Sequence, residues 1–479
     1  MNILWLNANL LLPLDKGGKL RTWHVMRHLA MRHQITYLSF CDPGQPLEDH
    51  EGMREVCAEL HTVPRTDPPK GTARFYLDAA RYLVDPVPYG VAKYRSEPFR
   101  ARLAALLRER RFDAAVCDFL VPIVNMPERL PCPAILFTHN VEAEIWRRHA
   151  ENAGNPMARA LLRRQWTRML RFERGALARF DLTLAVSEAD RDTFQRLYPD
   201  ALAAPAHVVQ TGVDTSYFVP SEAPGHRAHL VLPGSMDWLP NEDGMLYFVR
   251  EIPPRIRQVE PEATLSIIGR APTPAVRRLA ETSGIEVTGR VDDVRPHIAA
   301  GEVYIVPLRI GGGTRLKIFE AMAMGKAVVS TTVGAEGLPV TPGQNVVIAD
   351  EPARFAQAVV HMIRDADARR RIEAEARRIV VERYDWSAVA EDFEDALRRV
   401  IAGASRGADG LERTACAGAR TDEQADSGGM GAMKVSVFGL GYVGSVSAAS
   451  FAADGHTVVG VDVNPEKVAS LNEGRSPIV

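Results

Sequence analysis

A glycine-rich loop and the helix expected after it carry the strongest chemical signal in the sequence. The loop follows an apolar run that ends at Val306 and consists of Gly311, Gly312, Gly313 and Thr314. Glycines let the backbone approach a ligand closely, and the N–H groups at a helix N-terminus favour an anion. Arg315 and Lys317 add positive charge in the first turn, where the helix dipole disfavours it unless a phosphate is bound. With Glu320 further along to accept hydrogen bonds from ribose hydroxyls, the pattern predicts a phosphate and ribose site. A flexible turn before an ordinary amphipathic helix is the alternative.

Other candidate site residues follow the ends of expected strands. His139 comes directly after the apolar run 134–138, at the edge where open α/β sheets place their ligands. Gly17 and Gly18 lie in the loop after the first expected strand, and Gly234 follows a later one. A structural histidine and plain turns are the alternatives, because a lone His and a short glycine loop are common in ordinary folds.

A third motif lies near the end of the chain. Gly439, Gly441 and Gly444 follow an expected strand and open an expected helix, and Asp462 ends the next strand. In this context a G-x-G-x-x-G motif predicts dinucleotide binding, with the aspartate on the ribose hydroxyls and therefore NAD preferred over NADP.

The elements that would position these motifs alternate regularly along the chain. Short apolar or β-branched runs are separated by longer helical segments, which predicts α/β architecture with parallel sheets. Two such series follow one another, so we expect two doubly wound, Rossmann-like domains. The expected divisions are a first domain at 1–205, a second at 206–385, a closing helix at 386–402, a disordered linker at 403–432 and a truncated βαβ fragment at 433–479.

Composition excludes several classes of protein. The 479 residues are 46% hydrophobic and 25% charged, an ordinary globular balance that argues against wholesale disorder. A net charge of -2 gives the whole chain no electrostatic reason to bind nucleic acid. Five cysteines without a C-x-x-C pair favour reduced thiols in the cytoplasm over a disulfide framework or a structural zinc site. The sequence has no apolar stretch long enough for a membrane span.

The segment from Arg147 to Arg179 is strongly basic, with apolar residues interleaved. Its arginines outnumber its two glutamates, Glu151 and Glu173. A basic helix with apolar anchors can lie on an anionic membrane, which would suit peripheral attachment at the inner face. A solvated helix face over a normally buried stripe is the alternative.

Several motifs together resemble one family. The glycine loop, Gly17-Gly18, 138–142, 211–214, 234–238, 287–293 and 336–338 resemble the retaining family 4 (group 1) glycosyltransferases of bacterial exopolysaccharide clusters. The resemblance covers residues 1 to about 402. It implies a GT-B fold, in which two Rossmann-like domains face a cleft, and transfer of a sugar from a nucleotide-diphosphate donor to a glycan or lipid-linked acceptor.

The resemblance also implies roles for single residues. Glu320 matches the second glutamate of the family's Glu-x7-Glu motif, which binds the donor ribose, whereas the first glutamate is replaced by Gly312. Ser235 stands where many relatives have an arginine that neutralises the diphosphate, so we expect Arg315 and Lys317 to supply that charge. His139 is expected beside the donor sugar, and Gly17 and Gly18 beside the diphosphate and acceptor. Transfer would retain the anomeric configuration and need no metal or other cofactor.

The last residues resemble a different family. The run 433–479 is similar to the extreme N-terminus of GDP-mannose and UDP-glucose 6-dehydrogenases, which implies an NAD site that is incomplete and inactive in this chain. Two origins of this run are open. It is either part of a downstream gene fused by read-through or a frameshift, or part of a true bifunctional protein whose sequence is incomplete. A dehydrogenase activity and a non-catalytic sugar-nucleotide-binding protein are therefore the alternatives to a glycosyltransferase.

Overall fold

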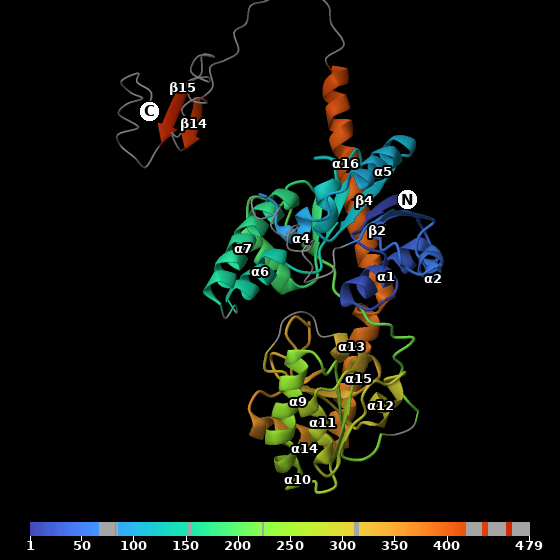
Figure 1. Cartoon of the computed structure of the whole chain (residues 1–479), viewed down its shortest axis with the longest axis vertical. Coiled ribbons are helices and arrows are strands. Elements are labelled where there is room, and N and C mark those ends of the chain that lie inside the picture. Colours follow the sequence, from blue (N-terminus) through green and yellow to red (C-terminus); the bar gives the residue numbers. More distant parts are fainter. Residues whose placement is uncertain are drawn as a thin grey trace, which may run out of the picture. The chain divides into compact units, whose positions relative to one another are not determined.

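The computed structural model describes residues 1–66, 82, 85–151, 153, 155–222, 225–310, 316–417, 434–438 and 457–461. The chain divides into two compact units, Met1–Asp409 and Gly410–Val479. The α/β architecture predicted from the alternating pattern is confirmed in the first unit, which contains two parallel sheets (Figure 1). Within the described residues, no helix is long and apolar enough to cross a membrane.

The first sheet has seven described strands in the order β3-β2-β1-β4-β5-β6-β7, and all of its pairings are parallel. The strands are β1 (Asn2–Leu6), β2 (Gln34–Cys41), β3 (Glu59–Pro64), β4 (Ala114–Asp118), β5 (Ala134–Phe137), β6 (Leu182–Ala185) and β7 (His207–Val208). The order reverses between β1 and β4, and the crevice at such a point is where open α/β sheets bind ligands.

Helices separate most of the strands of this sheet along the chain. They are α1 (Gly17–Ala30), α2 (Leu47–Gly52), α4 (Tyr89–Ala92), α5 (Glu97–Glu109), α6 (Glu142–Glu151), α7 (Pro156–Leu177) and α8 (Glu188–Leu197), with short 3-10 turns at Met53–Glu55 and Val121–Asn125. Several begin at a side-chain cap, as α5 does at Ser96, whose hydroxyl accepts from the Phe99 N–H at 3.3 Å.

The second sheet repeats the same winding. Its six described strands run in the order β10-β9-β8-β11-β12-β13, again all parallel. The strands are β8 (His229–Pro233), β9 (Thr264–Ile268), β10 (Ile285–Val287), β11 (Val303–Val306), β12 (Ala327–Ser330) and β13 (Val347–Ile348). The helices are α9 (Leu239–Glu251), α10 (Pro253–Arg257), α11 (Pro274–Arg278), α12 (Arg295–Ala300), α13 (Leu316–Ala323), α14 (Pro352–Arg364) and α15 (Ala366–Arg383), with a 3-10 turn at Leu279–Glu281.

Helix α16 (Trp386–Ala417) returns from the second domain to the first. Its Trp386, Phe393 and Leu397 side chains belong to the same buried cluster as Ile3 and Trp5 of β1. The Phe393 ring is stacked on Trp5, with centroids 5.5 Å apart. The first domain is therefore built from two separate stretches of the chain, and its core is completed by the last helix.

The segment that returns to the first domain, before α16, lies against the segment that leaves it, after β7. The Val213 N–H donates to the Tyr384 carbonyl at 2.8 Å, and the Thr215 hydroxyl donates to Asp385 Oδ2 at 2.6 Å. Gly212 is packed so closely here that a Cβ would lie 2.7 Å from the Trp386 ring. The two crossings are thus bonded to each other where they pass between the domains.

Two predicted divisions need correction. Strand β7 pairs with β6, so the first sheet extends past the boundary predicted at residue 205. Helix α16 runs to Ala417, so the linker predicted from residue 403 does not begin there. The linker was inferred from the lack of large apolar residues, but a helix that is already nucleated gains one hydrogen bond for each residue added, and α16 continues although this stretch contains Gly403, Gly407 and Gly410. The remainder of the predicted linker, 418–432, lies outside the described residues.

In the second unit the structure describes one pair of strands. Strands β14 (Lys434–Phe438) and β15 (Thr457–Val461) pair in parallel, as expected for the first and second strands of a βαβ unit.

Phe393 generates a test of the returning helix. Replacing this buried ring by alanine leaves a cavity between Trp5 and Phe137, so we expect Phe393→Ala to lower the free energy of unfolding by about 3–5 kcal/mol. Glu391→Ala, at an exposed position of the same helix, should change it by less than about 0.5 kcal/mol. Urea unfolding followed by circular dichroism measures both values, and equal values for the two variants would contradict the packing described here.

Candidate functional site

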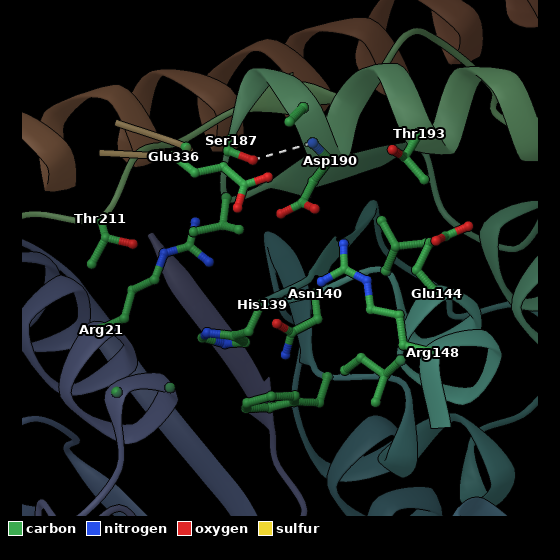
Figure 2. A pocket seen from close by; sticks show the side chains of 18 of the residues that line it. Arg21, His139, Asn140, Glu144, Arg148, Ser187, Asp190, Thr193, Thr211 and Glu336 are labelled. Atoms are coloured by element: carbon green, nitrogen blue, oxygen red, sulfur yellow. Dashed lines mark hydrogen bonds between the residues drawn. The ribbon is translucent and has the colours of Figure 1, made fainter. Parts of the chain in front are cut away.

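A cavity of about 500 Å³ opens at the carboxyl ends of the first sheet. Figure 2 shows Arg21, His139, Asn140 and Asp190 of the first domain around it, with Glu336 of the second domain close to Asp190. Leu316 and Gly337 of the second domain also line it, beside Gly17, Gly18, Phe119 and Thr211 of the first. The structure therefore brings the predicted Gly17, Gly18 and His139 together, and adds second-domain residues to them.

His139 is held from several directions. Its Nε2 atom lies 2.7 Å from Asp118 Oδ1, and its ring is stacked on Phe119 with centroids 4.0 Å apart. A Cβ on Gly18 would lie 2.7 Å from the Phe119 ring and 3.6 Å from His139 Nδ1, so the helix start is pressed against both rings. Burial lowers the pKa of His139, with Arg21 adding to this effect and Asp118 opposing it. The imidazole is therefore neutral near pH 7.

Arg21 is a buried cation that sequence reasoning missed. Its guanidinium donates to the Thr138 carbonyl at 2.7 Å and to the Val209 carbonyl at 2.5 Å, and it lies over the Phe137 ring. Burial lowers the pKa of Arg21 to about 9, although the nearby carboxylates of Asp118 and Asp190 oppose the change. Arg21 thus joins α1 to the ends of β5 and β7 and carries positive charge to the cavity wall.

Helix α6 brings further polar side chains to the cavity. A buried glutamate of α7, Glu173, accepts from the Glu142 and Ala143 N–H groups and from the Tyr198 hydroxyl, at 2.9, 3.1 and 2.6 Å. A carboxylate at this place satisfies the otherwise unpaired N–H groups at the start of α6. The cap fixes the helix, whose Glu144 and Arg148 line the cavity.

Asp190 of α8 is a second residue missed from the sequence. The Ser187 hydroxyl caps this helix by accepting from the Asp190 N–H at 3.1 Å. Burial raises the pKa of Asp190, although Ser187, Arg21 and Arg148 act in the opposite direction. A carboxylate here can accept a hydrogen bond from a sugar hydroxyl in the cavity. The one sequence signal for Asp190 is its position shortly after strand β6.

A separate cluster lies at the carboxyl end of β8. Lys317 Nζ donates to the Pro233 carbonyl at 3.3 Å and to Asn241 Oδ1 at 3.1 Å. A Cβ on Gly234 would lie 2.9 Å from Asn241 Nδ2, so the backbone, the amide and the ammonium group are in close contact. The predicted Gly234 and Lys317 therefore lie together at the topological switch point of the second sheet.

Glu320 lies one turn beyond Lys317 on α13. Burial raises the pKa of Glu320 to about 7, with Lys317 opposing the shift. Burial raises the pKa of the Tyr304 phenol on β11, and the charge of Glu320 adds to this effect. Hydrogen bonds from the hydroxyl groups of a ligand would favour the charged form of the Glu320 carboxyl group and lower its pKa.

Several predicted site residues lie outside the described part of the chain. They are Gly311, Gly312, Gly313, Thr314 and Arg315 of the glycine loop, and Gly439, Gly441, Gly444 and Asp462 of the terminal motif. Among the described residues, no group of three or more His, Cys, Asp or Glu side chains could hold a metal ion.

The basic segment separates into two kinds of arginine. Arg159, Arg168 and Arg179 donate to backbone carbonyls of Ala153, Tyr82 and Met126, and therefore hold the fold together. The outer face of α7 keeps exposed arginines and two exposed apolar side chains, namely Arg163, Arg164, Arg171, Met157 and Leu161.

Two family matches cover the first unit. Residues 16–217 match the family described as Glycosyltransferase Family 4, and residues 227–365 match Glycosyl transferases group 1. The first unit belongs to the GT-B glycosyltransferases. This glycosyltransferase unit accounts for both sheets, and the predicted GT-B fold is confirmed.

Solved structures share the fold of the first unit, and a curated protein is similar to part of the chain. HepE of Anabaena, solved in complex with UDP and glucose, is 14% identical with a TM-score of 0.56, over 83% of this chain and 100% of HepE. A protein from the cps region of Klebsiella pneumoniae is 25% identical over 168 residues, which make up 33% of this chain. The chain spans 43% of the length of that relative.

The end of the chain matches a different family. Residues 433–479 match the NAD binding domain of the UDP-glucose/GDP-mannose dehydrogenase family. The GDP-mannose 6-dehydrogenase of Pseudomonas aeruginosa is 55% identical over 47 residues, which are 10% of this chain and 11% of the dehydrogenase. The resemblance expected for this segment is confirmed.

Glu320 gives the site a testable pH dependence. Its pKa is about 7 in the folded protein against an ordinary value of 4.5, so the folded state holds a proton that the unfolded chain releases between these pH values. The free energy of unfolding must therefore fall as the pH rises through this window. Glu320→Gln removes the titration, and we expect it to gain about 2–3 kcal/mol relative to the parent between pH 5 and pH 8. Urea unfolding at several pH values measures this, and a difference that does not change with pH would refute it.

Proposed function

We propose that the first unit transfers a sugar, with retention of the anomeric configuration, from a nucleotide-diphosphate donor to a hydroxyl of a glycan or lipid-linked acceptor. The observation that carries the proposal is the cavity itself. His139 and the first two residues of α1, Gly17 and Gly18, line it from the first domain, and Leu316 and Glu336 from the second. A site built at the ends of two Rossmann-like sheets suits a reaction in which donor and acceptor must be held together.

The donor would bind at the second sheet. Lys317, beside Gly234 and Asn241, is placed to neutralise a diphosphate, and Glu320 to accept hydrogen bonds from a ribose. HepE, whose fold this unit shares, is known with UDP and with UDP-glucose bound, which supports a nucleotide sugar as the donor class.

Catalysis would depend on positioning and electrostatics. The bond from the anomeric carbon to the diphosphate breaks while the acceptor oxygen forms the new bond on the same face, and a diphosphate oxygen takes the acceptor's proton. Lys317 and Arg315 would stabilise the negative charge on the leaving diphosphate, which is the charge a metal ion often neutralises. We infer that no metal cofactor is required.

The biological setting would be the assembly of a surface polysaccharide. The similarity to a protein of a cps region supports this context. A lipid-linked acceptor would bring the enzyme to the inner face of the cytoplasmic membrane, where the outer face of α7 offers arginines and apolar side chains to anionic lipid.

Lys317 provides the test of the proposed function. The assay measures transfer of labelled sugar from a panel of UDP- and GDP-sugars, together with the release of the free nucleoside diphosphate. We expect Lys317→Ala to reduce kcat/KM for the donor about 10- to 100-fold, because a hydrogen bond to a charged group is lost. Arg354→Ala, an exposed arginine of α14, serves as the matched control and should leave kcat/KM unchanged.

Three results of this assay would contradict the proposal in whole or in part. Loss of activity with EDTA and its recovery with Mg²⁺ would refute the metal-independent mechanism. Reduction of NAD by the purified chain, without sugar transfer, would favour a dehydrogenase instead. Tight binding of a nucleotide sugar without turnover under any condition would indicate a non-catalytic binding protein.

The membrane contact has its own test. Each arginine near an anionic bilayer contributes about 1 kcal/mol, so replacing Arg163, Arg164 and Arg171 together by glutamine should weaken vesicle binding roughly 100-fold. Flotation with phosphatidylserine vesicles at low salt measures the bound fraction. The matched control replaces three exposed arginines elsewhere, Arg354, Arg370 and Arg399, by glutamine. Equal flotation of both variants would show that α7 is only a solvated helix.

A further inference from the structure

A buried carboxylate lies behind His139, at the switch point of the first sheet. Asp118 is the last residue of β4, and its side chain is 0% exposed. It points to the same face of the sheet as Trp5, because alternate residues of a strand face alternate sides and Trp5 pairs with Val116. Helix α1 covers this face, so Asp118 lies between the strand ends and the start of the helix that lines the cavity.

The two oxygens of Asp118 have different partners. Among the described side chains, Oδ2 accepts from Asn7 Nδ2 at 2.6 Å, Thr22 Oγ1 at 2.7 Å and Trp5 Nε1 at 3.2 Å. Oδ1 lies 2.7 Å from Nε2 of His139. An ionised carboxylate can only accept hydrogen bonds, so the hydrogen in this last contact must reside on Nε2.

The other ring nitrogen of His139, Nδ1, is close to a glycine of the cavity lining. Nδ1 lies toward Gly18, where a Cβ would be 3.6 Å away, and His139 and Gly18 both line the cavity. Stacking on Phe119, at an interplanar angle of 17°, hinders rotation of the imidazole. In a neutral ring whose Nε2 carries the hydrogen, Nδ1 presents a lone pair.

We propose that Asp118 is a positioning residue that holds His139 in the Nε2–H tautomer, so that Nδ1 accepts the hydrogen of a sugar hydroxyl in the cavity. The inference rests on the proposed function for the identity of the ligand, but the tautomer itself exists without substrate. The class of ligand group follows from the chemistry. A lone pair recognises a hydroxyl donor and repels a phosphate oxygen, so the sugar rather than the diphosphate lies at Nδ1.

The charges around the ring agree with this assignment. Arg21 lies near His139 and disfavours a second proton on the imidazole, and burial acts in the same direction. Asp118 favours the proton but is already hydrogen-bonded to Asn7, Thr22 and Trp5, which reduces the charge it presents to the ring. The resting state is therefore a neutral imidazole with a fixed orientation.

Asp118→Asn reverses the hydrogen-bond pattern with little change in shape. The three donors at Oδ2 require an acceptor, so the amide oxygen must face them and the NH₂ group must face His139. The NH₂ group would then donate to Nε2 and force the hydrogen of the imidazole onto Nδ1. A hydroxyl that donates to Nδ1 in the parent would meet an N–H group in the variant.

The test reads the tautomer directly. Histidine ¹⁵N resonances distinguish Nε2–H from Nδ1–H rings, and comparison with His139→Gln assigns the signal of His139 among the 13 histidines. We expect Nε2–H in the parent and Nδ1–H in Asp118→Asn, together with a fall in kcat of roughly 10- to 100-fold. Thr22→Val removes one donor from Oδ2 without touching His139, so it should keep the Nε2–H tautomer even if its stability falls.

Each result of this test either supports or overturns the proposed role of Asp118. An Nδ1–H ring or an imidazolium in the parent at pH 7 would overturn the inference, even if Asp118→Asn failed to fold. An unchanged tautomer in a folded Asp118→Asn would also overturn it, and so would a reversed tautomer with unchanged kcat. If the tautomer reverses as expected but no sugar transfer is found in the parent, the proposed function fails while the role of Asp118 in orienting the ring stands.

Discussion

The buried carboxylate of Asp118 is the interaction on which the first half of the site depends. An ionised group in a protein interior is tolerated only when its lone pairs are satisfied, and here the donors come from β1, the loop after it, α1 and the turn after β5. Satisfying one charge therefore aligns four segments of the chain. The same contacts shape the cavity wall. Asp118 bonds to His139 and to Thr22 of α1, and these bonds help to fix Gly18, Phe119 and His139 relative to one another.

The second half of the site depends on a cation in a comparable way. Lys317 is held by a backbone carbonyl and by Asn241, at the end of the strand that corresponds to β1 in the second sheet. The two domains thus use one topology with opposite charges at their switch points. A buried acid orients a neutral imidazole in the first domain, and a lysine held at the strand end offers positive charge in the second. This difference suits a cleft in which one side meets hydroxyl groups and the other meets phosphates.

Sequence reasoning succeeded where a signal is local. Alternating apolar runs predicted both sheets, and glycines after expected strands singled out Gly17, Gly18 and Gly234, whose role in binding stays a prediction. Strand β3 was missed because its residues, Glu59 to Pro64, are mixed in polarity, as is typical of an edge strand that is only half buried. Asp118 and Arg21 were missed for a different reason. Their partners are far away in the chain, with Asp118 and Trp5 separated by 113 positions, and no spacing rule predicts such a contact.

The returning helix α16 affects how the protein comes into being. The core of the first domain includes Trp386, Phe393 and Leu397, which are translated only after the whole second domain. The first sheet therefore leaves the ribosome with α1 on the face around Trp5 but without α16, which completes the same core. During synthesis the core around Trp5 is therefore completed only after α16 has been translated, although the first strands of this domain are translated first.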